Sequence, residues 1–115
     1  MAQQIEKETE VNDMADYVEA ARLEQLLPGK STCVTIAGKD LALFNVDGTI
    51  YAIDDGCLHH GASLGTSKLE GKIVTCNAHG WKYDVTTGST VHVPGYGVKS
   101  YPVRLEDGRI LIEVA

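Results

Sequence analysis

Residues 57–80 read CLHHGASLGTSKLEGKIVTCNAHG, and this stretch decides how the rest of the chain is interpreted. It holds two Cys/His pairs, Cys57 with His59 and Cys76 with His79, separated by 16 residues. Each pair offers one thiolate and one imidazole, so a fold that brings the pairs together supplies four ligands of mixed softness. A donor set of this kind predicts a metal or iron–sulfur centre.

The same four residues allow two other interpretations. A zinc site would use the same donors in a tetrahedral arrangement, but the usual zinc patterns pair like ligands, two cysteines and then two histidines. Alternatively, the four side chains pack in a core and bind no metal, which requires two Cys/His pairs at this spacing by chance. The mixed pairs favour the iron–sulfur interpretation over both.

The C-x-H and C-x-x-H spacings, followed within two residues by Gly61 and Gly80, resemble the Rieske family of iron–sulfur proteins. The resemblance covers roughly residues 17–114. It implies one Rieske-type [2Fe-2S] cluster, with one iron held by the two cysteines and the other by two histidines. The cofactor-binding and metal-ligating residues implied in this way are Cys57, His59, Cys76 and His79.

The remaining histidines and cysteine receive no role in this centre. The family uses the histidine two residues after the cysteine, so His60 is expected to be a surface residue or docking contact. His92 is expected to be a strand residue without redox work. Cys33 is expected to be a small buried thiol within a sheet.

The resemblance implies an all-β Rieske fold, with an antiparallel sandwich or barrel-like base domain built from both ends of the sequence. A small cluster-binding subdomain is inserted at about residues 57–83. Residues 1–16 are expected to form an acidic N-terminal extension, and residues 17–115 the Rieske domain. A proline-containing loop at residues 94–97 matches the loop that covers the cluster in the family.

Alternating apolar residues and Gly-containing turns locate the elements of this fold. Strands are predicted over 17–23, 31–36, 41–46, 49–53, 81–85, 90–93, 98–105 and 109–114, with a strand pair within 67–76 and one helical turn at 24–27.

Length and composition limit the function. With 115 residues the chain forms one domain, too small for a cluster, a flavin and a substrate pocket together. Residues 1–19 carry −5 of the net charge of −6, which argues against nucleic-acid binding. We expect a cytoplasmic protein, because no signal-peptide or membrane-span pattern is present and the third cysteine has no internal disulfide partner.

The family resemblance implies a soluble Rieske-type ferredoxin, an electron-transfer protein without catalytic residues of its own. Its partners would be a flavin-containing ferredoxin reductase and the terminal component of an oxygenase acting on aromatic compounds, with no membrane partner and a monomeric state. The alternative is a Rieske small subunit fixed in a larger oxidoreductase of the nitrite-reductase or arsenite-oxidase type.

Three departures from the high-potential respiratory members of the family predict a lower potential. Ala62 and Ala78 occupy the positions of their loop-linking disulfide, and Trp81 replaces a serine that donates to a cluster sulfide. Fewer donors to the sulfurs stabilise the added electron less. Asn77 is a further departure, because the family often has proline there.

Overall fold

The computed structural model describes residues 17–56, 62–78 and 80–113. Its elements are β1 (Tyr17–Arg22), the 3-10 turn η2 (Leu23–Gln25), β2 (Ser31–Ile36), β3 (Lys39–Val46), β4 (Thr49–Asp54), β5 (Lys68–Glu70), β6 (Ile73–Thr75), β7 (Lys82–Asp84), β8 (Ser100–Tyr101), β9 (Val103–Glu106) and β10 (Arg109–Glu113). These strands confirm the all-β prediction. Within these ranges, no helix has the length and apolarity needed to cross a membrane.

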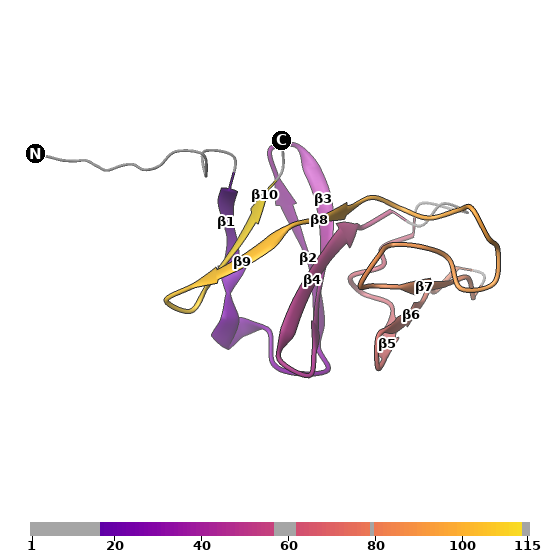
Figure 1. Ribbon diagram of the computed structural model, residues 1–115, viewed down its shortest axis with the longest axis horizontal. Helices are drawn as coiled ribbons and strands as arrows, with labels where there is room; N and C mark the ends of the chain where they lie inside the picture. The colour runs from indigo at the N-terminus through magenta and orange to yellow at the C-terminus, as the bar shows by residue number, and fades with distance from the viewer. Residues whose placement is uncertain (1–16, 57–61, 79, 114–115) are drawn as a thin grey trace, which may run out of the picture.

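Two antiparallel sheets make the base domain (Figure 1). One has the strand order β1-β10-β9 and the other the order β2-β3-β4-β8. Tyr17 on β1 lies opposite Glu113 on β10, which confirms that both ends of the sequence contribute to this domain. The apolar side chains between the sheets form its core, namely Leu26, Ile36, Leu41, Leu43, Ile50, Ala52, Tyr101, Ile110 and Ile112.

Strand β3 is buried on both faces and separates two cores. Because side chains alternate along a strand, Leu41 and Leu43 enter the base-domain core while Ala42 and Phe44 point to the opposite side. All four side chains are fully buried. A continuous apolar run is the sequence pattern of a strand covered on both faces.

The hairpin turns follow the expected chemistry. Asp47-Gly48 joins β3 to β4 and Asp107-Gly108 joins β9 to β10, with positive φ at all four residues. Asp and Gly tolerate this left-handed backbone, which two-residue hairpins require. The turn between β2 and β3 is shorter than predicted, because Ile36 already pairs with Lys39.

The prediction of one continuous strand over residues 98–105 was wrong, because the structure has two strands there, β8 and β9. β8 pairs with β4 through Tyr101 and Ala52, whereas β9 pairs with β10 through Val103 and Ile112. Pro102 lies between β8 and β9, and proline has no N–H for a sheet ladder. The chain therefore changes sheets at this residue.

The third sheet, β5-β6-β7, lies on the far side of the second sheet from β1, β9 and β10 (Figure 1). We call the described residues 62–78 and 80–98 the inserted subdomain. Its strands come from the predicted strand pair and from the strand predicted at 81–85. It shares a second core with β3 and β4, made of Ala42, Phe44, Ile53, Leu64, Val74, Cys76, Tyr83 and Val85.

Residues 90–93 do not form the predicted strand. Thr90 makes an isolated bridge with Tyr83, and the chain then turns through an exposed loop. The inserted subdomain leaves the base domain after β4 and returns before β8, where the Asp54 N–H donates to the Lys99 carbonyl at 2.9 Å. Its entry and exit are therefore adjacent.

Candidate iron–sulfur centre

The structure places one of the four predicted ligands. Cys57, His59 and His79 lie outside the described residues, as does His60. Cys76 is described and is 2% exposed. Among the described residues, no three His, Cys, Asp or Glu side chains gather as a metal-binding group. Convergence of the four predicted ligands therefore stays a prediction.

Cys76 begins the connection from β6 to β7, which we call the second ligand loop, residues 76–81. The Cys76 N–H donates to the Trp81 carbonyl at 2.7 Å, and the Gly80 N–H donates to the Cys76 carbonyl at 3.1 Å. Gly80 has a φ of +77°, a backbone conformation that glycine adopts without strain. The loop is therefore closed tightly at its base.

The side chain of Cys76 lies in the second core with Tyr83, which is fully buried. Burial in apolar surroundings keeps a structural cysteine inert, whereas bound iron stabilises the thiolate form. The sheet places Tyr83 opposite Val74, two residues before Cys76. A buried cysteine at the start of a closed loop fits the donor set of a Rieske cluster.

We call residues 57–61, which include Cys57 and lie outside the described residues, the first ligand loop. Gly56 before it and Ser63 after it form an antiparallel bridge. The Leu64 N–H donates to the Asp55 carbonyl at 2.7 Å. The described residues that flank this loop are thus held together.

The proline-containing loop lies beside the second ligand loop. Thr90 closes it, because its N–H donates to the Tyr96 carbonyl at 2.9 Å. His92 packs edge-on against Trp81, with the ring centroids 5.8 Å apart. His92 lies in this loop and is exposed, so the prediction that it lies in a strand was wrong. Sequence reasoning missed this contact because Trp81 and His92 do not face each other across a strand pair.

Cys33 lies in β2, as predicted, but it is exposed and the prediction of a buried thiol was wrong. The outer face of an edge strand leaves a small residue partly uncovered. Partial desolvation of the sulfur and a hydrogen bond to the Asp55 carboxylate nevertheless raise the pKa of the Cys33 thiol to about 11. The thiol stays protonated at neutral pH.

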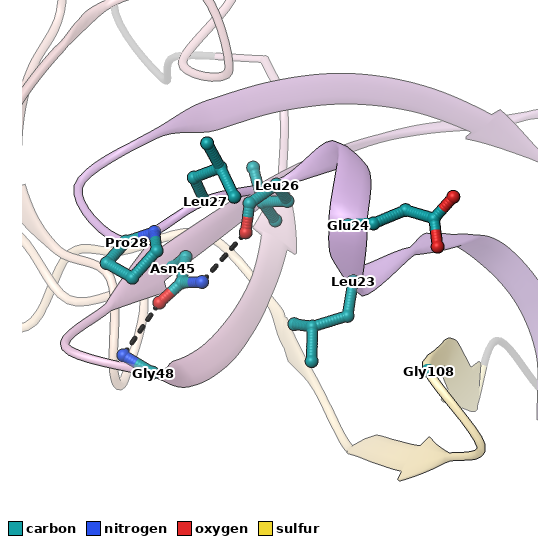
Figure 2. Close-up of a pocket in the computed structure, with 8 residues that line it drawn as sticks. All are labelled: Leu23, Glu24, Leu26, Leu27, Pro28, Asn45, Gly48 and Gly108. Carbon is teal, nitrogen blue, oxygen red and sulfur yellow. Dashed lines mark hydrogen bonds between the residues drawn. The ribbon is translucent and has the colours of Figure 1, made fainter.

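A separate pocket of about 440 Å³ lies in the base domain (Figure 2). Its walls come from η2 and the turns at Gly48 and Gly108, and none of its lining residues belongs to the inserted subdomain. Asn45 shapes it by donating to the Leu26 carbonyl at 2.8 Å and accepting from the Gly48 N–H at 2.7 Å. The pocket is not part of the candidate centre.

Comparison with known proteins agrees with this geometry. The model of the Rieske [2Fe-2S] domain family matches residues 16–102. The ferredoxin component of a naphthalene 1,2-dioxygenase system from Pseudomonas putida is 38% identical over 100 residues, covering 86% of this chain and 96% of that protein.

Solved structures agree in fold. The ferredoxin of Sphingomonas yanoikuyae B1 superposes with a TM-score of 0.78 at 30% identity, covering 85% of this chain and 98% of that one. A chain from the complex of reduced oxygenase and oxidised ferredoxin in carbazole 1,9a-dioxygenase gives a TM-score of 0.79 at 26% identity, covering 85% and 93%. With its Cys/His spacing, its inserted subdomain and these matches, the chain belongs to the Rieske [2Fe-2S] family and holds one Rieske-type cluster.

Proposed function

We propose that the chain is a soluble, cytoplasmic, monomeric Rieske-type ferredoxin without catalytic activity of its own. It takes single electrons from a flavin-containing ferredoxin reductase and passes them to the terminal component of an aromatic-ring-hydroxylating oxygenase. Its near-complete coverage of a naphthalene dioxygenase ferredoxin supports this role. A chain seen with an oxygenase in the carbazole system shares its fold and supports the proposed recipient.

We also propose the ligand assignment. Cys57 and Cys76 hold one iron, and His59 and His79 hold the other. When bound, the cluster supplies storage for one electron at a potential above that of all-cysteine ferredoxins, because neutral imidazoles replace two thiolates. This chain keeps the Cys76 sulfur away from solvent and pairs the backbone of its loop internally.

One observation supports the carrier role: the second ligand loop starts at a buried cysteine, but three of the residues after it are exposed. Asn77, Ala78 and Gly80 are exposed, and Val91 and Tyr96 of the neighbouring loop are 52% and 60% exposed. A partner protein can therefore approach this loop closely. Close approach is what electron transfer between two separate proteins requires.

A catalytic oxygenase role is disfavoured by the ligand count. A mononuclear iron site of the oxygenase type needs two histidines and a carboxylate. With His59 and His79 assigned to the cluster, the four histidines of the chain leave only His60 and His92. His92 already packs against Trp81.

The test uses the purified chain with a flavin-containing reductase of a naphthalene dioxygenase system. We expect about two irons per chain, and bleaching of the visible spectrum when NADH and reductase are added. Cys76→Ser should abolish the colour, while Cys33→Ser should keep it. Cluster signal that migrates only in a high-mass complex during gel filtration of cell extract would overturn the free-carrier proposal in favour of a fixed subunit.

A further inference from the structure

A buried serine bonds to the segments on which both ligand loops depend. Ser67 is 6% exposed, and its hydroxyl donates to the Ser63 carbonyl at 2.7 Å. The same oxygen accepts the Asn77 N–H at 3.2 Å. Ser63 lies in the bridge that flanks the first ligand loop and Asn77 belongs to the second loop, so a single hydroxyl joins these two segments.

The side chain of Asn77 adds a second bond in the same place. Its Nδ2 donates to the Thr66 carbonyl at 3.3 Å. Proline, which the family often has at this position, could make neither this bond nor the backbone bond to Ser67. The substitution therefore ties the second ligand loop to residues 66–67.

Asp55 extends these bonds to the base domain. Asp55 is 6% exposed. Its Oδ1 accepts hydrogen bonds from the Ser63 hydroxyl at 2.9 Å and from the Gly65 N–H at 2.7 Å. Its own N–H donates to the Asp40 carbonyl of β3 at 3.0 Å. A buried carboxylate requires donors of this kind. Here they are Ser63 and Gly65, which follow the first ligand loop, and the Cys33 thiol of β2.

Gly65 fixes the same segment directly on β2. The Ser31 hydroxyl donates to the Gly65 carbonyl at 3.0 Å. A Cβ at Gly65 would lie 2.6 Å from the Thr32 carbonyl oxygen, so the two backbones touch. Residues 63–65 are therefore held by the base domain, and they in turn hold Ser67.

We propose that Asp55, Ser63, Ser67 and Asn77 form a positioning chain that sets the two ligand loops relative to each other and to the base domain. This chain of hydrogen bonds takes the place of a loop-linking disulfide, whose positions are Ala62 and Ala78. None of its members is a proposed ligand; they act through the loops. The inference rests on the proposed ligand assignment.

The experiment compares iron release from the purified holoprotein to a ferrous chelator after reduction by dithionite. Partners outside the ligand set typically change metal affinity by about 10- to 100-fold, so Ser67→Ala and Asp55→Ala should release iron roughly tenfold faster. Asp55→Asn keeps an acceptor oxygen and should restore most of the difference. Ser89→Ala and Asp54→Asn are matched controls, because neither residue belongs to the positioning chain. The Asp54 carboxylate accepts the hydroxyl of Tyr101.

A second readout separates positioning from general stability. The EPR g values of the reduced cluster should shift in Ser67→Ala and Asp55→Ala, and should match those of the native protein in Asp55→Asn and both controls. A merely structural role would lower the urea midpoint and leave the g values of the retained cluster unchanged. That result would overturn the proposal.

Two milder variants decide the question if Ser67→Ala or Asp55→Ala does not fold. Ser63→Ala removes the hydroxyl that bonds Asp55 and the Cys33 thiol, and Asn77→Ala removes the side-chain bond to Thr66. Each should accelerate iron release by about threefold. Release at the control rate in both would overturn the positioning chain. Native protein without iron would instead overturn the ligand assignment itself.

Discussion

The imidazole of His92 meets the indole of Trp81 edge-on, with the two ring planes inclined by 70°. Trp81 ends the second ligand loop, and His92 belongs to the loop that Thr90 closes. The backbone joins the same two segments, because the Val91 N–H donates to the Lys82 carbonyl at 2.9 Å. The ring pair therefore holds the proline-containing loop against the loop that carries Cys76.

Removing this ring should loosen the loop. His92→Ala should lower the free energy of unfolding by about 1 kcal/mol, the usual value of an edge-to-face aromatic pair. His92→Phe keeps an aromatic ring and should lose much less. Urea unfolding followed by far-UV circular dichroism measures both. Equal losses in the two variants would show that the ring contact contributes nothing.

Substitution of the histidines distinguishes the proposed ligand from its neighbour. His59→Cys should lower the reduction potential if the cluster survives, because a thiolate adds negative charge at the outer iron. His60→Ala should leave the visible and EPR spectra intact. Loss of the cluster in His60→Ala would show that the ligand assignment chose the wrong ring.

The potential should lie in the lower part of the Rieske range, which spans roughly −150 to +300 mV. The physical reason is that Ala62 and Ala78 cannot form the loop-linking disulfide and Trp81 cannot donate the serine hydroxyl bond to a cluster sulfide. The potential should be almost flat near neutral pH and should fall in alkaline solution, where imidazoles on ferric iron lose protons first. Protein-film voltammetry measures it; a value near the top of the range, or a steep slope at pH 7, would contradict the ferredoxin assignment.

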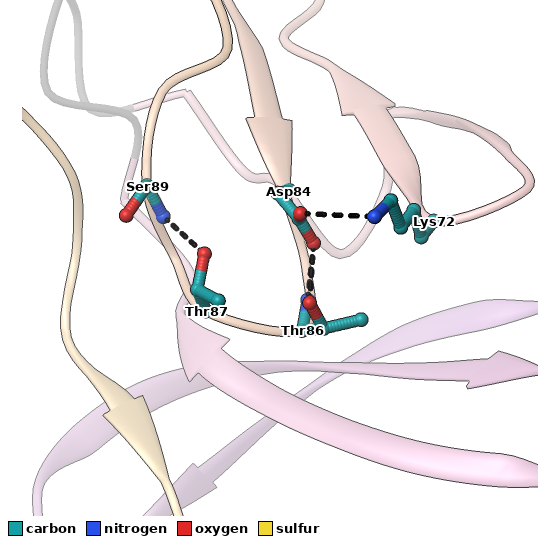
Figure 3. Close-up of polar contacts among 5 residues, drawn as sticks. All are labelled: Lys72, Asp84, Thr86, Thr87 and Ser89. Atoms are coloured by element: carbon teal, nitrogen blue, oxygen red, sulfur yellow. Dashed lines mark hydrogen bonds and ion pairs between the residues drawn. The ribbon is translucent and has the colours of Figure 1, made fainter. Parts of the chain in front are cut away.

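Asp84, at the end of β7, accepts hydrogen bonds from the Thr86 N–H at 2.9 Å and from its hydroxyl at 2.6 Å, and lies 3.6 Å from Lys72 Nζ (Figure 3). Partial burial acts to raise the pKa of this carboxyl. The Thr86 bonds and the Lys72 ammonium outweigh it, so the pKa is lower than the ordinary aspartate value. The folded state therefore favours the ionised carboxylate.

This depressed pKa stabilises the fold above the ordinary aspartate pKa of about 3.9, and the stabilisation is lost as pH falls through the folded value. Asp84→Asn should lower the free energy of unfolding by about 1 kcal/mol at pH 7. The difference from the native protein should close as the pH falls below about 4. Urea unfolding at a series of pH values measures it, and a gap that stays constant down to pH 3 would contradict the assignment.

Gly88 should tolerate no side chain. Its φ is +86°, and a Cβ there would collide with the Val98 carbonyl oxygen. This oxygen belongs to the backbone and cannot move aside as a flexible side chain could. Gly71, with a φ of +61°, has nothing within 4 Å of an added Cβ. Gly71→Ala should cost about 1 kcal/mol, and Gly88→Ala more than about 3 kcal/mol. Similar urea midpoints for the two variants would contradict this packing.

The sequence predicted the local elements well. β2 has the predicted bounds, and Asp47-Gly48 and Asp107-Gly108 form the predicted turns, because apolar alternation and residues that accept positive φ are local signals. The prediction failed where a distant partner decides. Pro102 marks a change of sheet, and the lack of a strand at 90–93 follows from a loop that packs on Trp81.

For the candidate centre, the sequence predicted the ligand residues but not the residues that surround them. The spacing of the Cys and His residues indicates the ligand set, but no sequence pattern marks Asp55 and Ser67. Their partners, Gly65 and Asn77, lie ten residues away in sequence and are reached through irregular backbone. A polar residue that becomes buried cannot be told from an exposed one until the surrounding chain is placed.

The pairing of β1 with β10 has a consequence for synthesis on the ribosome. Tyr17 cannot meet Glu113 until nearly the whole chain has emerged, so the first sheet of the base domain closes last. Strands β5, β6 and β7 need only neighbouring residues and can pair earlier. The nascent polypeptide therefore has a period in which the hairpins around Cys76 are formed while the base domain is still open, and iron delivery during translation would find its target before the fold is complete.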